Sequence, residues 1–112
     1  MINIRKINNR DEYNSFIDEE KEKLHIVKFG ADWCGPCKLL EKTIENLDNE
    51  KTNDVLFGEV EICDDATENL AAEFGISNIP VMLYVIGGDV KGTTKGALRA
   101  NDIYNKINEF KQ

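Results

Sequence analysis

The residues in this chain best suited to chemistry are two cysteines, Cys34 and Cys37, separated by two residues. They belong to the sequence WCGPC at residues 33–37, between an apolar segment over residues 26–31 and a segment with helical spacing over residues 34–49. The first turn of a helix has unpaired N–H groups and the positive end of the helix dipole, and both stabilise a thiolate. Because the thiolate is the nucleophile that opens a disulfide, this placement predicts reversible thiol–disulfide exchange.

Three further features accompany the cysteine pair. Pro36 suits the first turn of a helix, because its φ is already helical and it has no N–H to lose. Downstream lie Ile79-Pro80, at the start of an apolar strand, and the sequence KGAL at residues 95–98. WCGPC followed at these separations by Ile-Pro and Gly-Ala-Leu resembles the thioredoxin family over nearly the whole chain. In that family the three segments are the active site, the cis-proline loop and the end of the last strand.

The resemblance implies a protein disulfide reductase that works through a redox-active disulfide between Cys34 and Cys37. Cys34, nearer the exposed end of the helix, attacks a disulfide of a partner protein and forms a mixed disulfide. Cys37, one turn along and more buried, then attacks Cys34 and releases the reduced partner. The residues between them, Gly35 and Pro36, are similar to those of reducing members of the family. A thioredoxin reductase is expected to recharge the pair, and no bound cofactor is expected, because no glycine-rich phosphate loop follows any predicted strand.

The same resemblance implies a surface that binds partner proteins beside the disulfide. Trp33 is expected to be exposed next to Cys34. The peptide bond between Ile79 and Pro80 is expected to be cis and to face the disulfide, with the backbone of Ile79 pairing with an extended partner segment. Gly96, which has no side chain, lets another backbone approach the same surface.

The apolar patterning predicts strands and helices in the order βαβαβαββα. Strands joined through helices are expected to be parallel and covered on both faces, whereas Gly87-Gly88-Asp89 predicts a tight antiparallel hairpin near the end. The expected architecture is α/β, a mixed five-stranded central sheet flanked by four helices, as in the thioredoxin fold. Residues 1–112 are expected to form a single domain, because this length supplies one core and not two.

Composition and charge restrict the partners. The chain is 41% hydrophobic and 31% charged, an ordinary globular balance, and its formal net charge is −7. Nucleic acid is not an expected partner, because phosphate binding needs clustered lysines and arginines, and the net charge favours a soluble monomer. Residues 1–7 lack the apolar core of a signal peptide, and no stretch is long enough to cross a membrane. A cytoplasmic protein without a membrane partner is therefore expected.

Three other functions are compatible with the sequence. A CxxC pair can bind zinc, but a zinc site usually has four Cys or His ligands and only Cys63 and His25 remain, so no metal is expected. A more oxidising thiol–disulfide exchanger, such as an oxidase or isomerase, is the second. A thioredoxin-fold scaffold that binds a partner without redox turnover is the third, favoured by Lys28 and Gly30 but not by an intact CGPC sequence.

Lys28 departs most from the family pattern. Thioredoxins usually have a buried aspartate six residues before the first cysteine, whereas this chain has Lys28 there, in an otherwise apolar strand. A buried ammonium group is strongly unfavourable unless it is paired. We therefore hypothesise an ion pair of Lys28 with Glu61 beneath the disulfide, in which one of the two groups manages the proton of Cys37. In the alternative, Lys28 extends to solvent and takes no part.

Two further residues bear on the site. Gly30 stands where the family commonly has an aromatic residue, so a packing group near the cysteines is missing. Cys63, the third cysteine, lies at the end of a predicted strand and is followed by two aspartates. Nearby carboxylates disfavour a thiolate, so Cys63 is expected to be a structural and mostly buried residue.

Overall fold

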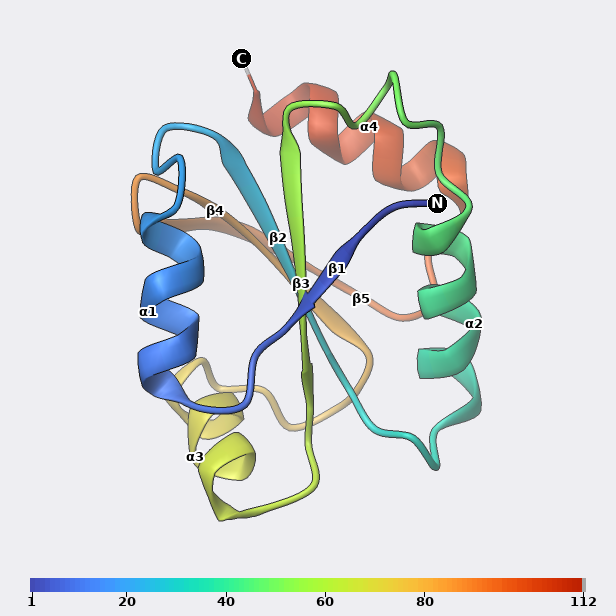
Figure 1. Cartoon of the computed structure of the whole chain (residues 1–112). Coiled ribbons are helices and arrows are strands. Elements are labelled where there is room, and N and C mark those ends of the chain that lie inside the picture. Colours follow the sequence, from blue (N-terminus) through green and yellow to red (C-terminus); the bar gives the residue numbers. More distant parts are fainter. Residues whose placement is uncertain (112) are drawn as a thin grey trace.

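The computed structural model describes residues 1–111 and consists of one sheet with helices on both faces (Figure 1). The elements are, in chain order, β1 (Ile4–Lys6), α1 (Arg10–Asp18), β2 (Leu24–Gly30), α2 (Gly35–Glu45), β3 (Val55–Glu61), α3 (Asp65–Glu73), β4 (Val81–Ile86), β5 (Asp89–Lys95) and α4 (Ala100–Phe110). Within these residues, five strands in one sheet and four helices confirm the predicted fold class and element order. None of the helices in this part of the chain has the length and apolar composition that a membrane crossing requires.

The strands lie side by side in the order β1-β3-β2-β4-β5, which places β2 at the centre. β3 is parallel to both β1 and β2, whereas β4 is antiparallel to β2, and β5 follows β4 through the predicted hairpin turn at Gly87 and Gly88. The expectation that strands joined through a helix are parallel is therefore wrong for the step from β3 to β4. Helix α3 lies across the lower end of the sheet in Figure 1 rather than along it, so the chain re-enters the sheet at the end where β3 left it.

Side chains alternate between the two faces of the sheet and bury two separate apolar clusters. On the side of α1 and α3, Val27, Phe29 and Val60 from the strands pack with Phe16 and Leu70 from the helices. On the side of α2 and α4, the buried members of the second cluster are Leu24, Ile26, Leu40, Ile44, Leu47, Phe57, Met82, Tyr84, Ile103 and Ile107. Each pair of helices therefore covers one face of the sheet (Figure 1).

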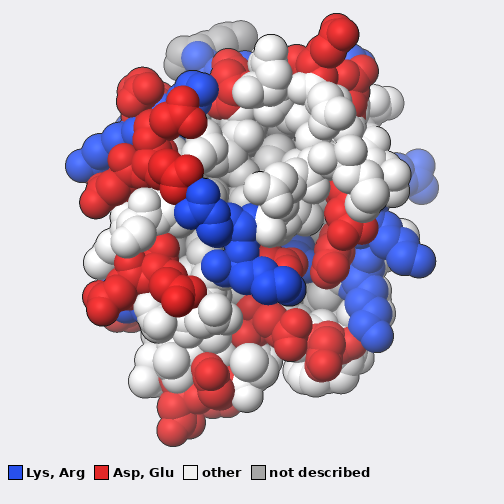
Figure 2. All heavy atoms as spheres, viewed as in Figure 1, with Lys and Arg blue, Asp and Glu red and all other residues white. Residues whose placement is uncertain are grey.

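Charges of both signs occupy the face of the molecule nearest the viewer in Figure 1. Figure 2 shows basic side chains over the middle of this face, where β1 crosses in front of the sheet, and acidic side chains on either side. The two basic residues of β1 are paired: Arg5 lies 2.9 Å from Glu19, and Lys6 lies 3.0 Å from Glu59. The basic groups of β1 are thus held in ion pairs and do not form a free basic patch.

The central strand β2 carries the residues that lead to the cysteine pair. It is hydrogen-bonded to β3 on one side and β4 on the other, and all 7 of its residues are buried. Because side chains alternate along a strand, Ile26, Lys28 and Gly30 share the face that α2 covers. β2 ends at Gly30, and a short loop leads from there to Cys34 at the start of α2.

Gly58 of β3 offers a test of the packing on the α1 side. A Cβ at this position would lie 2.8 Å from Cδ1 of Ile7 and 2.9 Å from Cε2 of Phe16, and the Phe16 ring is fully buried. We expect Gly58→Ala to lower the free energy of unfolding by about 1–3 kcal/mol, measured by urea denaturation, because it overpacks this core. Gly35→Ala is the control, since a Cβ there has no neighbour within 4 Å. Equal losses in the two variants would contradict the packing described.

Candidate active site

Cys34 and Cys37 are joined by a disulfide at the point where the loop after β2 enters α2. Cys34 is the N-cap of α2, and its Sγ accepts a hydrogen bond of 3.2 Å from the backbone N–H of Cys37. Gly35 and Pro36 lie in the first helical turn, as expected from the sequence. When the disulfide is opened, a thiolate on Cys34 faces this N–H donor and the positive end of the helix dipole. The start of α2 therefore favours the nucleophilic form of Cys34.

The two cysteines differ in their access to solvent. Cys34 is 7% exposed and Cys37 is 2% exposed, so a partner molecule reaches Cys34 more readily. Trp33, directly before the pair, is 78% exposed, which confirms its expected place on the surface. An exposed indole next to the more accessible sulfur provides a flat apolar surface against which a protein can pack.

The segment before β4 lies against the disulfide. The peptide bond between Ile79 and Pro80 is cis, as the resemblance implied, and Ile79 packs on the cluster of Ala31 and the two cysteines. The N–H of Gly96 donates a hydrogen bond of 2.9 Å to the carbonyl oxygen of Pro80. Gly96 has a φ of 89°, in the region that favours glycine. The structure thus gathers Ile79, Pro80 and Gly96 beside the cysteine pair.

The antiparallel direction of β4 is what makes this contact possible. Val81, the first residue of β4, lies opposite Phe29 near the end of β2, and it also lies opposite Lys95 at the end of β5. The start of β4, the end of β5 and the end of β2 consequently meet at one end of the sheet. A parallel β4 would have placed the cis-proline loop at the opposite end, away from the cysteines.

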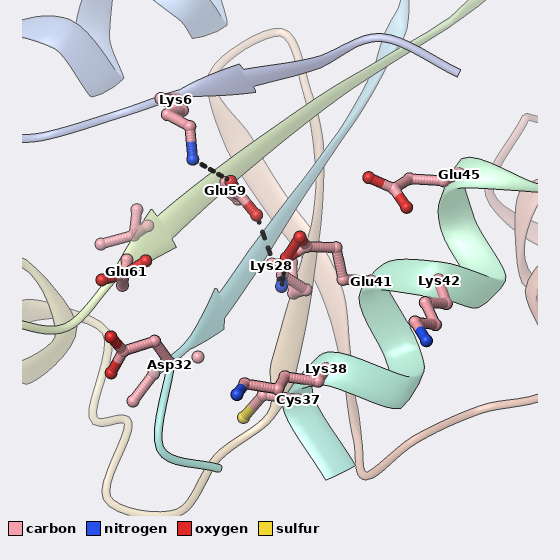
Figure 3. A pocket seen from close by; sticks show the side chains of 13 residues that line it. Lys6, Lys28, Asp32, Cys37, Lys38, Glu41, Lys42, Glu45, Glu59 and Glu61 are labelled. Carbon is pink, nitrogen blue, oxygen red and sulfur yellow. Dashed lines mark hydrogen bonds and ion pairs between the residues drawn. The ribbon is translucent and has the colours of Figure 1, made fainter. Parts of the chain in front are cut away.

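Lys28 lines the same cavity as Cys37, and its ammonium group lies between two carboxylates (Figure 3). Its Nζ is 3.4 Å from Oε2 of Glu59 on β3 and 3.6 Å from Oε1 of Glu41 on α2. The side chain is buried, so the alternative in which Lys28 extends to solvent is wrong. Lys6 on β1 donates a hydrogen bond of 3.0 Å to the other oxygen of Glu59, and this bond raises the pKa of Lys6. Two ammonium groups therefore share the Glu59 carboxylate.

The predicted ion pair between Lys28 and Glu61 is wrong. In the parallel pairing of β2 with β3, Lys28 lies opposite Glu59, and Glu61 lies opposite Gly30. Both glutamates are on the same face of β3, so the alternation of side chains does not distinguish them. Glu59 is buried, whereas Glu61 is exposed. Sequence spacing predicts the face of a strand, but the register against its neighbour selects the partner of Lys28.

A cavity of about 370 Å³ opens between α2 and the ends of β2 and β3, and Cys37 forms part of its wall (Figure 3). Most of its lining is charged. The charged lining residues are Lys6, Lys28, Asp32, Lys38, Glu41, Lys42, Glu45, Glu59 and Glu61. The less exposed of the two cysteines is thus next to a polar space and not only to an apolar core.

Gly30 lies between this charge cluster and the disulfide. A Cβ added to Gly30 would lie 3.1 Å from both Cβ and Sγ of Cys37, and 3.9 Å from Nζ of Lys28. The sequence indicated a missing packing group at this position. The structure places the resulting gap between the sulfur and the ammonium group, so both face the same small space.

Two site residues, Glu41 and Glu59, were not selected from the sequence. Glu41 follows Cys37 by four positions, and residues four apart share one face of a helix, so the sequence carried a signal for it. Glu59 had no comparable signal, because only the register of β2 against β3 separates it from Glu61.

Cys63 is exposed and free, which corrects the expectation that it is buried. It lies two residues after the end of β3 and directly before Asp64, the N-cap of α3. Its backbone N–H donates a hydrogen bond of 3.0 Å to Oγ1 of Thr67. The position thus belongs to a loop between two elements, and the backbone is held in place while the thiol remains in contact with solvent.

His25, the other residue considered as a zinc ligand, is buried, and its ring nitrogens face backbone carbonyl oxygens. Its two ring nitrogens lie 3.0 Å and 2.6 Å from the carbonyl oxygens of Lys23 and Glu19. No group of three or more His, Cys, Asp or Glu side chains in residues 1–111 is arranged to hold a metal ion. The structure therefore lends no support to a metal centre built on the CxxC pair.

Because the more accessible sulfur lies where the start of a helix stabilises a thiolate, the site is that of a dithiol–disulfide exchange protein. Comparison with known proteins leads to the same class. A family model described as Thioredoxin matches residues 4–109. The chain belongs to the thioredoxin family, and it is a protein disulfide oxidoreductase.

Individual relatives cover most of the chain. A thioredoxin of Chlorobaculum thiosulfatiphilum is 37% identical over 90 residues, which is 80% of this chain and 82% of that protein. A thioredoxin of Callithrix jacchus is 31% identical over 107 residues, which is 96% of this chain and 98% of that protein. Among solved structures, the thioredoxin of Fasciola hepatica matches with a TM-score of 0.84 at 25% identity, over 95% of this chain and 98% of that one.

Gly30→Ala tests the close approach of β2 to the disulfide. The added Cβ would lie 3.1 Å from both Cβ and Sγ of Cys37. The disulfide holds Sγ in place, whereas reduction lets Sγ take another rotamer and relieves that one of the two contacts. We expect the free energy of unfolding to fall by about 1–3 kcal/mol in the oxidised protein and by less in the reduced protein. Urea denaturation with and without a reductant measures both values, and an equal loss in the two forms would argue against this contact.

Labelling with iodoacetamide tests the placement of Cys63. In the folded, oxidised protein we expect a single adduct, on Cys63, because the other two cysteines are in a disulfide. Mass spectrometry of the labelled peptides identifies the site, and Cys63→Ser should abolish the adduct. An unmodified Cys63 in the native protein would show that the thiol is not exposed.

Proposed function

We propose that this chain is a disulfide reductase whose catalytic residues are Cys34 and Cys37. The observation that supports this most directly is the disulfide whose more exposed cysteine, Cys34, is the N-cap of α2. In the reduced protein, the Cys34 thiolate attacks one sulfur of a target disulfide and releases the other as a thiolate. Cys37 then loses its proton and attacks Sγ of Cys34, which closes the disulfide and releases the reduced target. Two electrons pass from the protein to the target.

The proposed docking surface consists of Trp33, Ile79, Pro80 and Gly96. Ile79 packs on the cysteine pair, and β4 begins directly after Pro80. An extended target segment that pairs with the backbone of Ile79 brings its disulfide close to Cys34. The exposed indole of Trp33 supplies apolar contact area for the target.

A thioredoxin reductase is the proposed electron donor, so that the protein carries electrons from that enzyme to disulfide-containing targets. No bound cofactor is needed for this role, because the cysteine pair itself stores the two electrons. The net charge of −7 supports a monomer that binds neither nucleic acid nor membranes. We further propose that residues 1–112 form one domain that works in the cytoplasm, where a CxxC pair is more often catalytic than structural.

Substitution of each cysteine separates the two roles. Cys37→Ser is expected to accumulate a mixed disulfide between Cys34 and insulin, because the resolving thiol is absent, whereas Cys34→Ser is expected to form none. Non-reducing electrophoresis and mass spectrometry of the adduct measure both outcomes. The rate of insulin reduction by dithiothreitol, followed by turbidity, should fall to the uncatalysed rate in either variant.

Cys63→Ser is the matched control, because it removes the exposed thiol and leaves the cysteine pair intact. It is expected to reduce insulin at the wild-type rate. An adduct that forms through Cys63, or a wild-type rate no faster than dithiothreitol alone, would overturn the proposal. The second result, together with stable binding of a partner that does not need the cysteines, would favour the scaffold function.

A further inference from the structure

The attack and resolution steps described above name only the two sulfurs, yet one charge of the buried cluster beside the pair lies close to Cys37. Around the position of a Cβ on Gly30, apart from the adjoining residues, the three nearest atoms are Cβ and Sγ of Cys37 and Nζ of Lys28. Neither carboxylate that binds Lys28 is among these atoms. The ammonium group of Lys28 is therefore nearer to this position than the carboxylates of Glu41 and Glu59 are.

The charges of the cluster differ in how strongly solvent screens them. The side chains of Lys28 and Glu59 are 6% and 11% exposed, whereas those of Glu41 and Lys6 are 39% and 73% exposed. A buried charge acts at a distance more strongly than one in contact with water. Glu59 is also shared, at 3.0 Å from Lys6 and 3.4 Å from Lys28. Because Glu59 is shared with Lys6 and Glu41 is partly screened by solvent, the ammonium group of Lys28 beside Cys37 is incompletely neutralised.

Further charged groups face the cavity from α2, from β3 and from the loop after β2. They are Lys38, Lys42, Glu45, Glu61 and Asp32. All except the half-buried Glu45 are exposed, so solvent screens them. Two are positive and three are negative, so together they add no net positive charge to the cavity.

We propose that Lys28 is a positioning residue that stabilises a thiolate on Cys37 and thereby favours the reduced form of the cysteine pair. The inference rests on the proposed function, because it concerns the redox equilibrium of that same pair. Reduction breaks the bond between Cys34 and Cys37 with two electrons from an external dithiol or from glutathione, whose thiols become a disulfide. The two sulfurs take up two protons if both become thiols, and fewer if one remains a thiolate.

A cation beside Cys37 favours the product that keeps a thiolate. The exchange equilibrium with glutathione is therefore displaced toward the reduced pair, and the protein is a weaker reductant than the same fold with a neutral residue at this position. The displacement of this equilibrium by Lys28 grows with pH. At low pH both sulfurs of the reduced pair are protonated, so the charge at position 28 has little effect.

The equilibrium of the cysteine pair with reduced and oxidised glutathione, measured from about pH 6 to about pH 9, tests this role. Lys28→Met removes the charge and is expected to shift the equilibrium constant about tenfold toward the disulfide at the upper end of this range, which corresponds to about 30 mV. The shift is expected to be smaller at the lower end. Lys28→Arg keeps the charge and is expected to remain close to the wild type at every pH.

Glu59→Gln is the counterpart that separates electrostatics from structure. Lys28→Met and Glu59→Gln both break the same ion pair, so a purely structural role shifts the equilibrium in the same direction in both variants. An electrostatic role shifts it in opposite directions, because Glu59→Gln leaves the ammonium group less neutralised and favours the reduced pair. If Lys28→Met does not fold, the test is the direction in which Glu59→Gln shifts the equilibrium with glutathione. A shift toward the reduced pair supports the inference, and no shift or a shift toward the disulfide overturns it.

The remaining outcomes are distinguishable from a failure of the proposed function. A wild-type pair that neither exchanges with glutathione nor reduces insulin would overturn the proposed function and this inference with it. Normal insulin reduction, combined with a Lys28→Met equilibrium equal to the wild type at every pH, would overturn this inference alone.

Discussion

A central strand that is buried on both faces must carry apolar side chains or paired polar groups, and the one lysine of β2, Lys28, is held in ion pairs. Removing one partner of a buried ion pair strongly destabilises a protein, because the other charge is left buried and unpaired. The elements that supply the partners of Lys28 must therefore keep their positions relative to β2. Glu59 from β3 and Glu41 from α2 bind its ammonium group, and Lys6 from β1 binds the same Glu59 carboxylate. Three neighbouring strands and the helix that begins at the cysteine pair are thereby joined through one charge cluster.

The direction of the strands places the segments of the proposed docking surface next to that helix. The end of β2, the start of β4 and the end of β5 meet at one end of the sheet, which brings Ile79 to the disulfide and Gly96 to Pro80, although both are distant from the cysteines in the sequence. Gly30 completes the arrangement, because even a Cβ there would lie only 3.1 Å from both Cβ and Sγ of Cys37. The exposure of Cys34, the contact of Ile79 with the cysteines and the proximity of Lys28 to Cys37 all depend on this one end of the sheet.

The site combines a conventional cysteine pair with an unconventional electrostatic environment. Thiol–disulfide exchange itself needs only the two sulfurs and the donors at the start of α2, which this chain has. The charges behind the pair are a separate variable, because they act on the relative stability of thiol and thiolate without touching the target. An ammonium group in this place is compatible with the chemistry of the family while changing the equilibrium at which that chemistry operates.

The sequence by itself determined the order of the elements, the hairpin at Gly87 and Gly88, and a CxxC pair at the start of a helix. These follow from side-chain periodicity and from the backbone preferences of glycine and proline, which act between residues close in the chain. Tertiary structure alone decided the direction of β4 and the choice of Glu59 over Glu61 as the partner of Lys28. Strand direction and register depend on contacts between segments far apart in the chain, and two glutamates on the same face of a strand are equivalent until a neighbouring strand is aligned with it.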